Sequence, residues 1–202
     1  MEESGKVNIS FLKAEENDIK EMAKIEKEFF ASYDRAFDEL TLSKWFSHNP
    51  DMFYAVKDDA GELLAFSIMA PITSDLYQRL RAGQVSDMFD FKEEEVLKAF
   101  ESDYYYIADI CVRNFDNESK YLRVATLLII EMVKIMYQKA KFVMTTPVTD
   151  KGLKMTKTIG FKPVAIDEHN GQKFPICEII VSDENKKRFD MLIEYSNRLA
   201  QR

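Results

Sequence analysis

The chain of 202 residues is long enough to bury a sizeable core, and it contains no linker rich in Pro, Gly or Ser, so we expect one domain over residues 1–202. Hydrophobic residues make up 46% and charged residues 31%, a balance that excludes a disordered or fibrous protein. The net charge of -7, without a Lys/Arg cluster, argues against nucleic acid as a partner, and no apolar run approaches the roughly 20 residues that a membrane span needs.

The N-terminal sequence and the cysteines indicate the cellular compartment. The first residues, MEESGKVN, are acidic and polar, whereas a secretory signal is basic and then apolar. Cys111 and Cys177 each lie inside an expected strand, and their spacing matches no metal-ligand motif. We therefore expect a cytoplasmic protein with reduced cysteines, no metal and no membrane partner.

The first residues predict a strand followed by a helix. Apolar and polar residues alternate from Val7 to Phe11, as in a half-buried strand. Asp18 and Glu21 then form a capping box for a helix whose apolar positions recur at helical spacing up to Phe30.

A second helix and a hairpin follow. Thr41 is a candidate N-cap of a short helix that ends at Asn49-Pro50. Two strands, Phe53–Lys57 and Leu63–Met69, flank a turn-rich tetrapeptide. This hairpin is the clearest antiparallel signal in the chain.

The segment Asp75–Phe100 predicts a helical insert. Its first residue is a candidate N-cap for a helix that stops at Gly83. Asp90 and Glu93 form a capping box for a second helix, in which the acidic run 93–95 would face solvent.

The second half of the chain alternates strands and helices. The expected elements are a strand at Tyr104–Val112, a helix at Leu122–Met136, a strand at Phe142–Thr145, a helix from Asp150 to Thr158 closed by Gly160, strands at Phe161–Ile166 and Phe174–Val181 around Asn170-Gly171, and a C-terminal amphipathic helix through Phe189. The strand Tyr104–Val112 is nearly all apolar, as a strand covered on both faces would be.

The junction between the strand Tyr104–Val112 and the following helix is the candidate functional region. Amides at a helix start lack intrahelical partners and carry partial positive charge, so a strand that leads into such an end is suited to bind an anion. The sequence therefore suggests a phosphorylated ligand at this junction.

The order of elements and three sequence units resemble the GNAT family of acyl-CoA-dependent N-acetyltransferases. The units are IADICVRNFDNESKYLRVATLLI, KFVMTTP and KMTKTIGFKPV, and the resemblance runs from Val7 to Val181. It implies an α/β (α+β) fold with a mixed, mostly antiparallel central sheet of about seven strands, flanked by helices, with the helical insert before the central strand. It also implies a transferase that moves acetyl from acetyl-CoA to a primary amine of a small-molecule or peptide acceptor.

Members of this family carry the motif Q/R-x-x-G-x-G/A where the loop meets the helix. The matching residues for cofactor binding are Lys120, Tyr121, Leu122, Arg123, Val124 and Ala125. Lys120 supplies the cation and Ala125 the small residue, but Arg123 replaces the central glycine. The Arg123 side chain can crowd the phosphates or bind them with its guanidinium group.

The resemblance also assigns catalytic positions. The backbone amide of Val112, or that of its neighbour Cys111, is the expected oxyanion donor and part of the cofactor site. Thr156 stands where many members have a tyrosine acid, and its hydroxyl is a far weaker acid. Asp109, the only carboxylate inside the strand Tyr104–Val112, is the candidate base because apolar neighbours would raise its pKa.

Structural alternatives stay open for these residues. Asp109 can be a hydrogen-bond acceptor in the sheet, and Cys111 a small core residue. The run 104–106 of three tyrosines favours strand packing over a substrate-facing wall, and His48 and His169 lie in polar contexts typical of surface residues. The departures at Arg123 and Thr156 also leave open a CoA sensor or protein-interaction module without activity, and the last strand pair and C-terminal helix are candidates for a homodimer interface.

Overall fold

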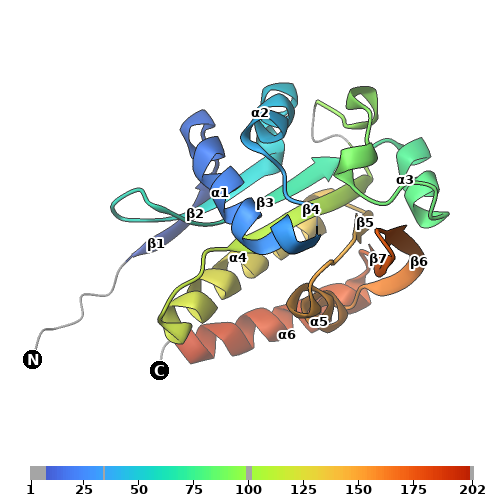
Figure 1. Cartoon of the computed structure of the whole chain (residues 1–202). Helices are drawn as coiled ribbons and strands as arrows, with labels where there is room; N and C mark the ends of the chain where they lie inside the picture. Colours follow the sequence, from blue (N-terminus) through green and yellow to red (C-terminus); the bar gives the residue numbers. More distant parts are fainter. Residues whose placement is uncertain (1–7, 34, 99–101, 201–202) are drawn as a thin grey trace, which may run out of the picture. The chain divides into compact units, whose positions relative to one another are not determined.

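The computed structural model describes residues 8–33, 35–98 and 102–200 (Figure 1). Seven strands form one sheet in the order β1-β2-β3-β4-β5-β7-β6. The strands are β1 (Ile9–Lys13), β2 (Phe53–Asp58), β3 (Leu63–Pro71), β4 (Tyr104–Val112), β5 (Phe142–Thr145), β6 (Lys162–His169) and β7 (Gln172–Ile180). The α-helices are α1 (Ile19–Phe30), α2 (Glu39–His48), α3 (Ser74–Arg81), α4 (Glu118–Lys139), α5 (Asp150–Ile159) and α6 (Asp183–Ala200).

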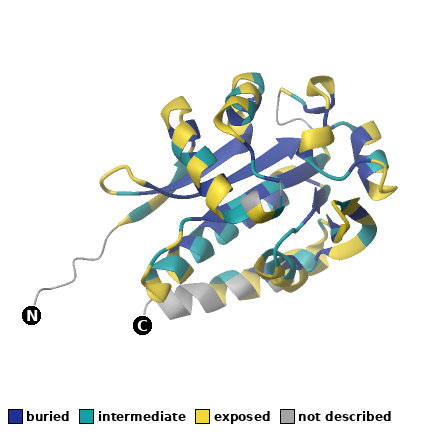
Figure 2. Ribbon diagram, in the orientation of Figure 1, coloured by how far each residue is buried: buried dark blue, intermediate teal, exposed yellow. Residues whose placement is uncertain are grey.

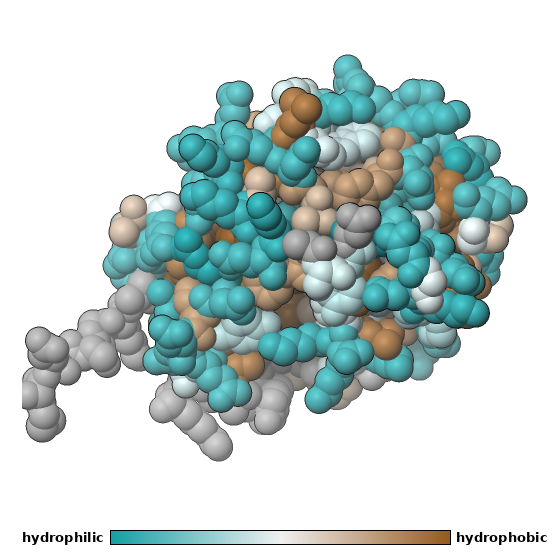
Figure 3. Space-filling view, viewed as in Figure 1, coloured by the Kyte–Doolittle hydropathy of each residue, from teal (hydrophilic) through white to brown (hydrophobic). Residues whose placement is uncertain are grey.

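The sheet is mixed and mostly antiparallel, as expected. β5 pairs with β4 in parallel, whereas the pairs β1–β2, β5–β7 and β6–β7 are antiparallel. The strands β2, β3, β4, β5 and β7 are mostly buried, whereas the residues of the edge strands β1 and β6 are mostly half-buried or exposed, and the outer surfaces of the helices are exposed (Figure 2). On the face visible in Figure 3, hydrophilic residues cover most of the surface and strongly hydrophobic ones are scattered. Within the described residues, no helix is both long and apolar enough to traverse a bilayer.

Contacts within the chain define two compact units. Unit 1 contains Met1–Ser67 and Ile110–Glu131, and unit 2 contains Ile68–Asp109 and Met132–Arg202. The single domain expected from the sequence stays a prediction, and each unit is described by itself.

Unit 1 is built on the β1–β2 pair and the first two helices. The apolar faces of α1 and α2 are buried, including Met22, Ile25, Leu42 and Trp45. The predicted hairpin after β2 is confirmed: Gly61 donates its amide to the Asp58 carbonyl at 3.0 Å. The φ of +83° at Gly61 explains why a glycine stands there, since other residues rarely adopt it.

The helix starts in unit 1 differ from the predicted ones. Asp18 closes a 3₁₀ turn before α1 by accepting the Glu15 amide at 2.8 Å, and its carboxylate pairs with Lys57 at 2.7 Å. The predicted capping box at Asp18 and Glu21 is therefore wrong, because Asp18 serves the preceding turn.

The second helix, α2, begins earlier than predicted. Its N-cap is Asp38, whose side chain accepts the Thr41 amide at 2.8 Å, so Thr41 is not the cap. Hydrogen bonds from Thr41 lower the pKa of Asp38. The helix ends at Asn49 as predicted, since the Asn49 amide donates to the Trp45 carbonyl.

Unit 2 contains β5, β6, β7 and most of β4. β4 and β5 run parallel from the pair Tyr104–Phe142 to the pair Ile107–Thr145. β6 and β7 form the second predicted hairpin, in which Asn170 has φ +48° and Gly171 has φ +73°. Two consecutive positive φ values define the turn that Asn-Gly favours.

The predicted helical insert is only partly helical. α3 is capped by Thr73, whose side chain accepts the Leu76 amide at 3.3 Å, and not by Asp75. In place of a second helix, the chain forms two 3₁₀ turns, Met88–Asp90 and Glu93–Glu95. Phe100 lies outside the described residues.

Long-range backbone bonds explain this difference. Val96 forms an antiparallel bridge to Ile72, and the Leu97 amide donates to the Pro71 carbonyl at 2.8 Å. These bonds hold the chain extended where the sequence predicted a helix. Glu95 is buried in an ion pair with Arg79, so the acidic run 93–95 is not wholly solvated.

The other helices follow the predicted pattern with shifted ends. α5 is capped by Thr149 and ends at Gly160, whose φ is +108°. In unit 2, Phe189 of α6 is buried, and its ring lies 5.3 Å from that of Tyr137 at the end of α4. α4 begins at Glu118, one turn earlier than predicted.

Candidate functional site

The end of β4 has an open edge. Pairing with β5 stops at Ile107, but β4 continues to Val112. On the other edge, the Arg113 amide donates to the Leu64 carbonyl of β3 at 2.9 Å. Because successive amides of an extended strand point to opposite edges, the Val112 amide faces away from β3. Of the two expected oxyanion donors, Val112 therefore has the suitable direction, and the Cys111 amide does not.

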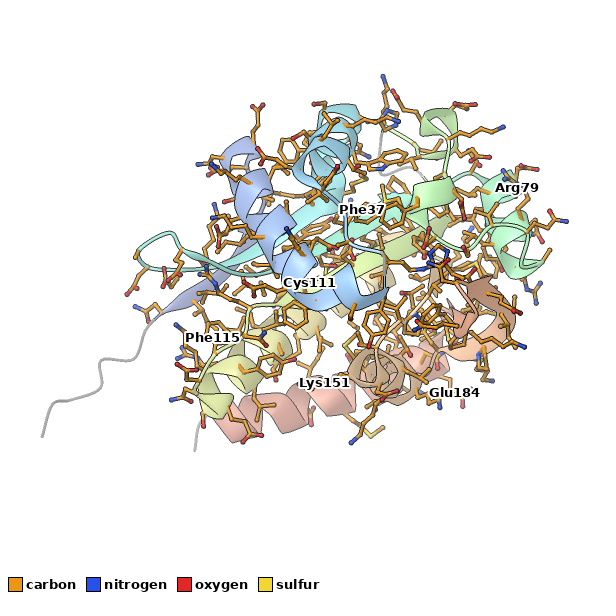
Figure 4. All side chains as sticks on the ribbon, viewed as in Figure 1. Phe37, Arg79, Cys111, Phe115, Lys151 and Glu184 are labelled. Atoms are coloured by element: carbon orange, nitrogen blue, oxygen red, sulfur yellow. The ribbon has the colours of Figure 1, made fainter. Side chains whose placement is uncertain are left out.

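A buried carboxylate from α1 supports this part of β4. Glu26 is 0% exposed and accepts hydrogen bonds from the Cys111 thiol at 3.5 Å and from the Phe37 amide at 3.3 Å. Figure 4 labels Cys111 and Phe37, the two partners of this carboxylate. Cys111 is thus a packed core residue whose thiol has a defined acceptor.

Sequence reasoning missed Glu26. The run KIEKEFF reads as an ordinary amphipathic helix with charged residues in water. The available signal was spacing: Glu26 follows buried Met22 by four residues and so lies on the same helix face.

Arg113 anchors the loop that leaves β4. Its guanidinium group pairs with Glu21 at 2.5 Å and also with Glu62. Glu21 also accepts a hydrogen bond from Lys24. This hydrogen bond lowers the pKa of the Glu21 carboxyl more than the charge of Arg113 does. The loop therefore starts from a fixed point in unit 1.

The start of α4 is capped by Asn117. Its side-chain oxygen accepts the Lys120 amide at 3.1 Å, and its carbonyl accepts the Tyr121 amide at 3.1 Å. The loop from β4 ends at this residue and α4 starts at Glu118, so the predicted helix start at Leu122 is wrong. The physical reason is that asparagine is a strong N-cap and starts the helix early.

The motif-like residues 120–125 consequently lie in the first two turns of α4. The Lys120 ammonium group lies 4.8 Å from the centre of the ring of Phe115, a residue that Figure 4 labels. Leu122 and Arg123 are exposed, whereas Val124 is buried. The cations expected to meet phosphate are thus near the loop, but the backbone at these positions is helical.

Two other candidate residues lie in unit 2. Asp109 of β4 is buried, with 6% of its surface exposed. Thr156 of α5 is also buried, and its hydroxyl donates to the Leu153 carbonyl at 3.0 Å. The structure therefore groups Cys111, Val112 and residues 120–125 in unit 1, and Asp109 and Thr156 in unit 2.

The tyrosine run in β4 serves packing, as the sequence favoured. Tyr105 and Tyr106 are 0% and 1% exposed. The Tyr106 hydroxyl donates to the Ser86 carbonyl at 3.2 Å, and burial raises the pKa of Tyr105.

Comparison with solved structures identifies the fold. The chain matches the loading GNATL domain of CurA from Lyngbya majuscula with a TM-score of 0.61 and 8% identity, over 86% of this chain and 98% of that domain. It matches yncA from Salmonella typhimurium, solved with its cofactor acetyl-CoA, with a TM-score of 0.58 and 8% identity, over 87% of this chain and 95% of that one. It matches the ribosomal-protein-S18-alanine N-acetyltransferase from Escherichia coli with a TM-score of 0.54 and 11% identity, over 87% of this chain and 95% of that one.

No protein-family model matches the chain, and no curated protein matches it in sequence. The fold is that of the GNAT acetyltransferases. At these identities, the likeness defines the fold alone.

Proposed function

We propose that this chain is an N-acetyltransferase that transfers acetyl from acetyl-CoA to a primary amine of a small molecule or peptide. The observation that carries the proposal is the open edge at the end of β4, where the Val112 amide faces away from β3. A buried amide without a strand partner can donate to an oxyanion, which is the central demand of acyl transfer. The GNAT fold supports the same reaction class.

The residues of unit 1 fit the parts of acetyl-CoA in different ways. At the strand end, the backbone of Val112 faces the open edge and can pair with an extended arm that carries amides. Lys120 and Arg123 offer cations for phosphates through their side chains, with Tyr121, Leu122, Val124 and Ala125 forming the helix that presents them. Bound acetyl-CoA would supply the thioester carbon that is attacked.

The reaction needs a proton acceptor, an oxyanion donor and a leaving thiolate. In the proposed mechanism, Asp109 takes a proton from the acceptor ammonium, and the Val112 amide stabilises the developing oxyanion. The new C–N bond forms as the C–S bond breaks. The hydroxyl of Thr156 already donates to the Leu153 carbonyl. The CoA thiol, with a pKa of about 8.5, therefore leaves as thiolate and takes its proton from water.

The test is turnover of acetyl-CoA with a panel of amines, measured as the release of free CoA thiol. Asp109→Asn should lower kcat by about a hundredfold, the lower range for loss of a general base. Asp103→Asn is the matched control, because Asp103 is an exposed partner of Lys141 in the same unit. Unchanged kcat in Asp109→Asn would exclude Asp109 as the base.

A second outcome of the same experiment concerns the sensor or interaction module. Binding of CoA without turnover over the whole panel would favour a CoA sensor, which the replacements at Arg123 and Thr156 suggest. The variants Asp109→Asn and Asp103→Asn must both unfold thermally like the wild type, so that a loss of fold is not taken for a loss of activity.

A further inference from the structure

We propose that Arg113 is the positioning residue of the oxyanion donor: its side chain, held by two carboxylates, fixes the direction of the preceding Val112 amide. The inference rests on the proposed function and deepens it, because it names the side chain on which the geometry of that amide depends. The contacts of Arg113 that carry it all lie within unit 1.

The end of β4 needs an anchor beyond its strand pairing. Pairing with β5 stops at Ile107, whereas β4 continues to Val112. On the β3 side, the Arg113 amide donates to the Leu64 carbonyl at 2.9 Å. A strand end that is bonded along one edge opens more readily than one bonded along both. The direction of the Val112 amide therefore depends on what holds the next residue.

The side chain of Arg113 supplies this anchor. Its guanidinium group pairs with Glu21 of α1 at 2.5 Å and with Glu62, two residues before Leu64. A planar guanidinium presents several donors in a fixed fork, so it can serve two carboxylates at once, whereas a lysine is a single point charge. The backbone bond to Leu64 restrains the strand end within the sheet, and the pair with Glu21 ties it to α1.

Helix α1 contacts the end of β4 at two points of matching spacing. Glu21 pairs with Arg113, and Glu26 accepts the Cys111 thiol. Five residues of helix rise about 7.5 Å and two residues of strand about 6.8 Å, so both contacts can form together. Val112 lies between the two contacted residues, and its backbone is restrained from both sides.

The charge of Arg113 is committed to its carboxylate partners. The side chains of Arg113 and Glu21 are 28% and 26% exposed, so their attraction is less screened than that of a fully exposed pair. With Glu62 as a second acidic partner, the guanidinium group has little charge left for a phosphate. Arg113 therefore acts through the Val112 amide and not by contact with the cofactor.

Arg113→Gln should lower kcat for amine acetylation by about tenfold to thirtyfold and change KM for acetyl-CoA by less than about twofold. A displaced oxyanion donor stabilises the transition state less, and complete loss of such a donor costs about a hundredfold or more. Steady-state kinetics with one amine measures both constants. An unchanged kcat, or a loss of kcat/KM through a higher KM alone, would overturn the inference.

A double-mutant cycle tests whether the effect passes through α1. Glu21→Gln should lower kcat less than Arg113→Gln does, because the pair with Glu62 remains. The double variant Glu21→Gln plus Arg113→Gln should match Arg113→Gln in kcat within about twofold, since both changes break one contact. Losses that multiply in the double variant would contradict the coupling.

Thermal unfolding and a matched control separate positioning from a structural role. Partly exposed ion pairs add little stability, so Tm of Arg113→Gln should lie within about 4 °C of the wild type. Arg113→Lys keeps a charge for one carboxylate and should have a kcat between those of Arg113→Gln and the wild type. Lys13→Gln breaks the exposed pair with Asp51 on the edge strand β1 and should leave kcat unchanged. An equal loss of kcat in Lys13→Gln would overturn the inference.

Hydrogen exchange of the Val112 amide, followed by NMR, tests the geometry without catalysis. In Arg113→Gln this amide should exchange at least about tenfold faster than in the wild type, while the amides of α2 keep their rates. An unchanged rate at Val112 would overturn the inference. If the wild type acetylates no amine of the panel, the proposed function fails, and this exchange rate alone decides whether Arg113 fixes the Val112 amide.

Discussion

Glu26 shows how a single side chain joins three segments of unit 1. Its carboxylate binds the thiol of Cys111 on β4 and the amide of Phe37 before α2. A buried acceptor that serves a backbone amide cannot be removed without leaving that amide unsatisfied. Glu26 therefore fixes the strand end that bears the proposed oxyanion donor.

Glu26→Ala should lower the free energy of unfolding by about 2–3 kcal/mol, because it leaves a cavity and removes the carboxylate acceptor of the Phe37 amide. Glu26→Gln keeps an acceptor oxygen of nearly the same shape and should cost less than half as much. Urea denaturation measures both. Glu28→Ala, an exposed glutamate on the same helix, is the control, and an effect of Glu26→Ala as small as that of Glu28→Ala would show that the carboxylate stabilises nothing.

At the scale of elements, the start of α4 is the decisive feature. Asn117 begins the helix one turn before the predicted start, and this places Lys120 and Arg123 on helical backbone. The consequence is chemical as well as geometric. At these two positions, side-chain charges, and not open backbone amides, are available to an anion.

Asn117→Ala should destabilise the protein by about 1 kcal/mol, the usual effect of losing an N-cap. Asn117→Asp should keep the cap, because a carboxylate accepts the Lys120 amide equally well and suits the helix dipole. Chemical denaturation of the three proteins is the measurement. If Ala and Asp behave alike, the early start of α4 does not depend on the Asn117 side chain.

At the scale of the whole molecule, ligand binding should appear as stability. At one hundred times its dissociation constant, a ligand of the folded state adds about 2.7 kcal/mol to the free energy of unfolding. For a chain of this size, CoA should therefore raise Tm by roughly 5–10 °C. Sulfate at matched ionic strength is the control, and no shift at millimolar CoA would contradict both the transferase and the sensor hypotheses.

The homodimer also belongs to this scale and stays a prediction. In unit 2, Ile166, Ile180 and Met191 are exposed on β6, β7 and α6. Single exposed apolar residues are normal on monomers, so they do not decide the oligomeric state.

The sequence by itself determined the elements whose signals are local. The strands Tyr104–Val112 and Phe142–Thr145 have the predicted bounds, and the Asn170-Gly171 turn joins the predicted hairpin. Turn chemistry and hydrophobic patterns act over a few residues, so a single sequence contains them. The resemblance through the unit around Cys111 likewise led to the GNAT fold.

Only the tertiary structure decided what depends on distant partners. The backbone bond between Leu97 and Pro71 keeps the insert extended, and no local pattern contains it. The burial of Glu26 and the direction of the Val112 amide likewise depend on contacts with β4 and β3. Buried polar groups must find partners wherever the fold brings them, and that requirement fixed the geometry of the candidate site.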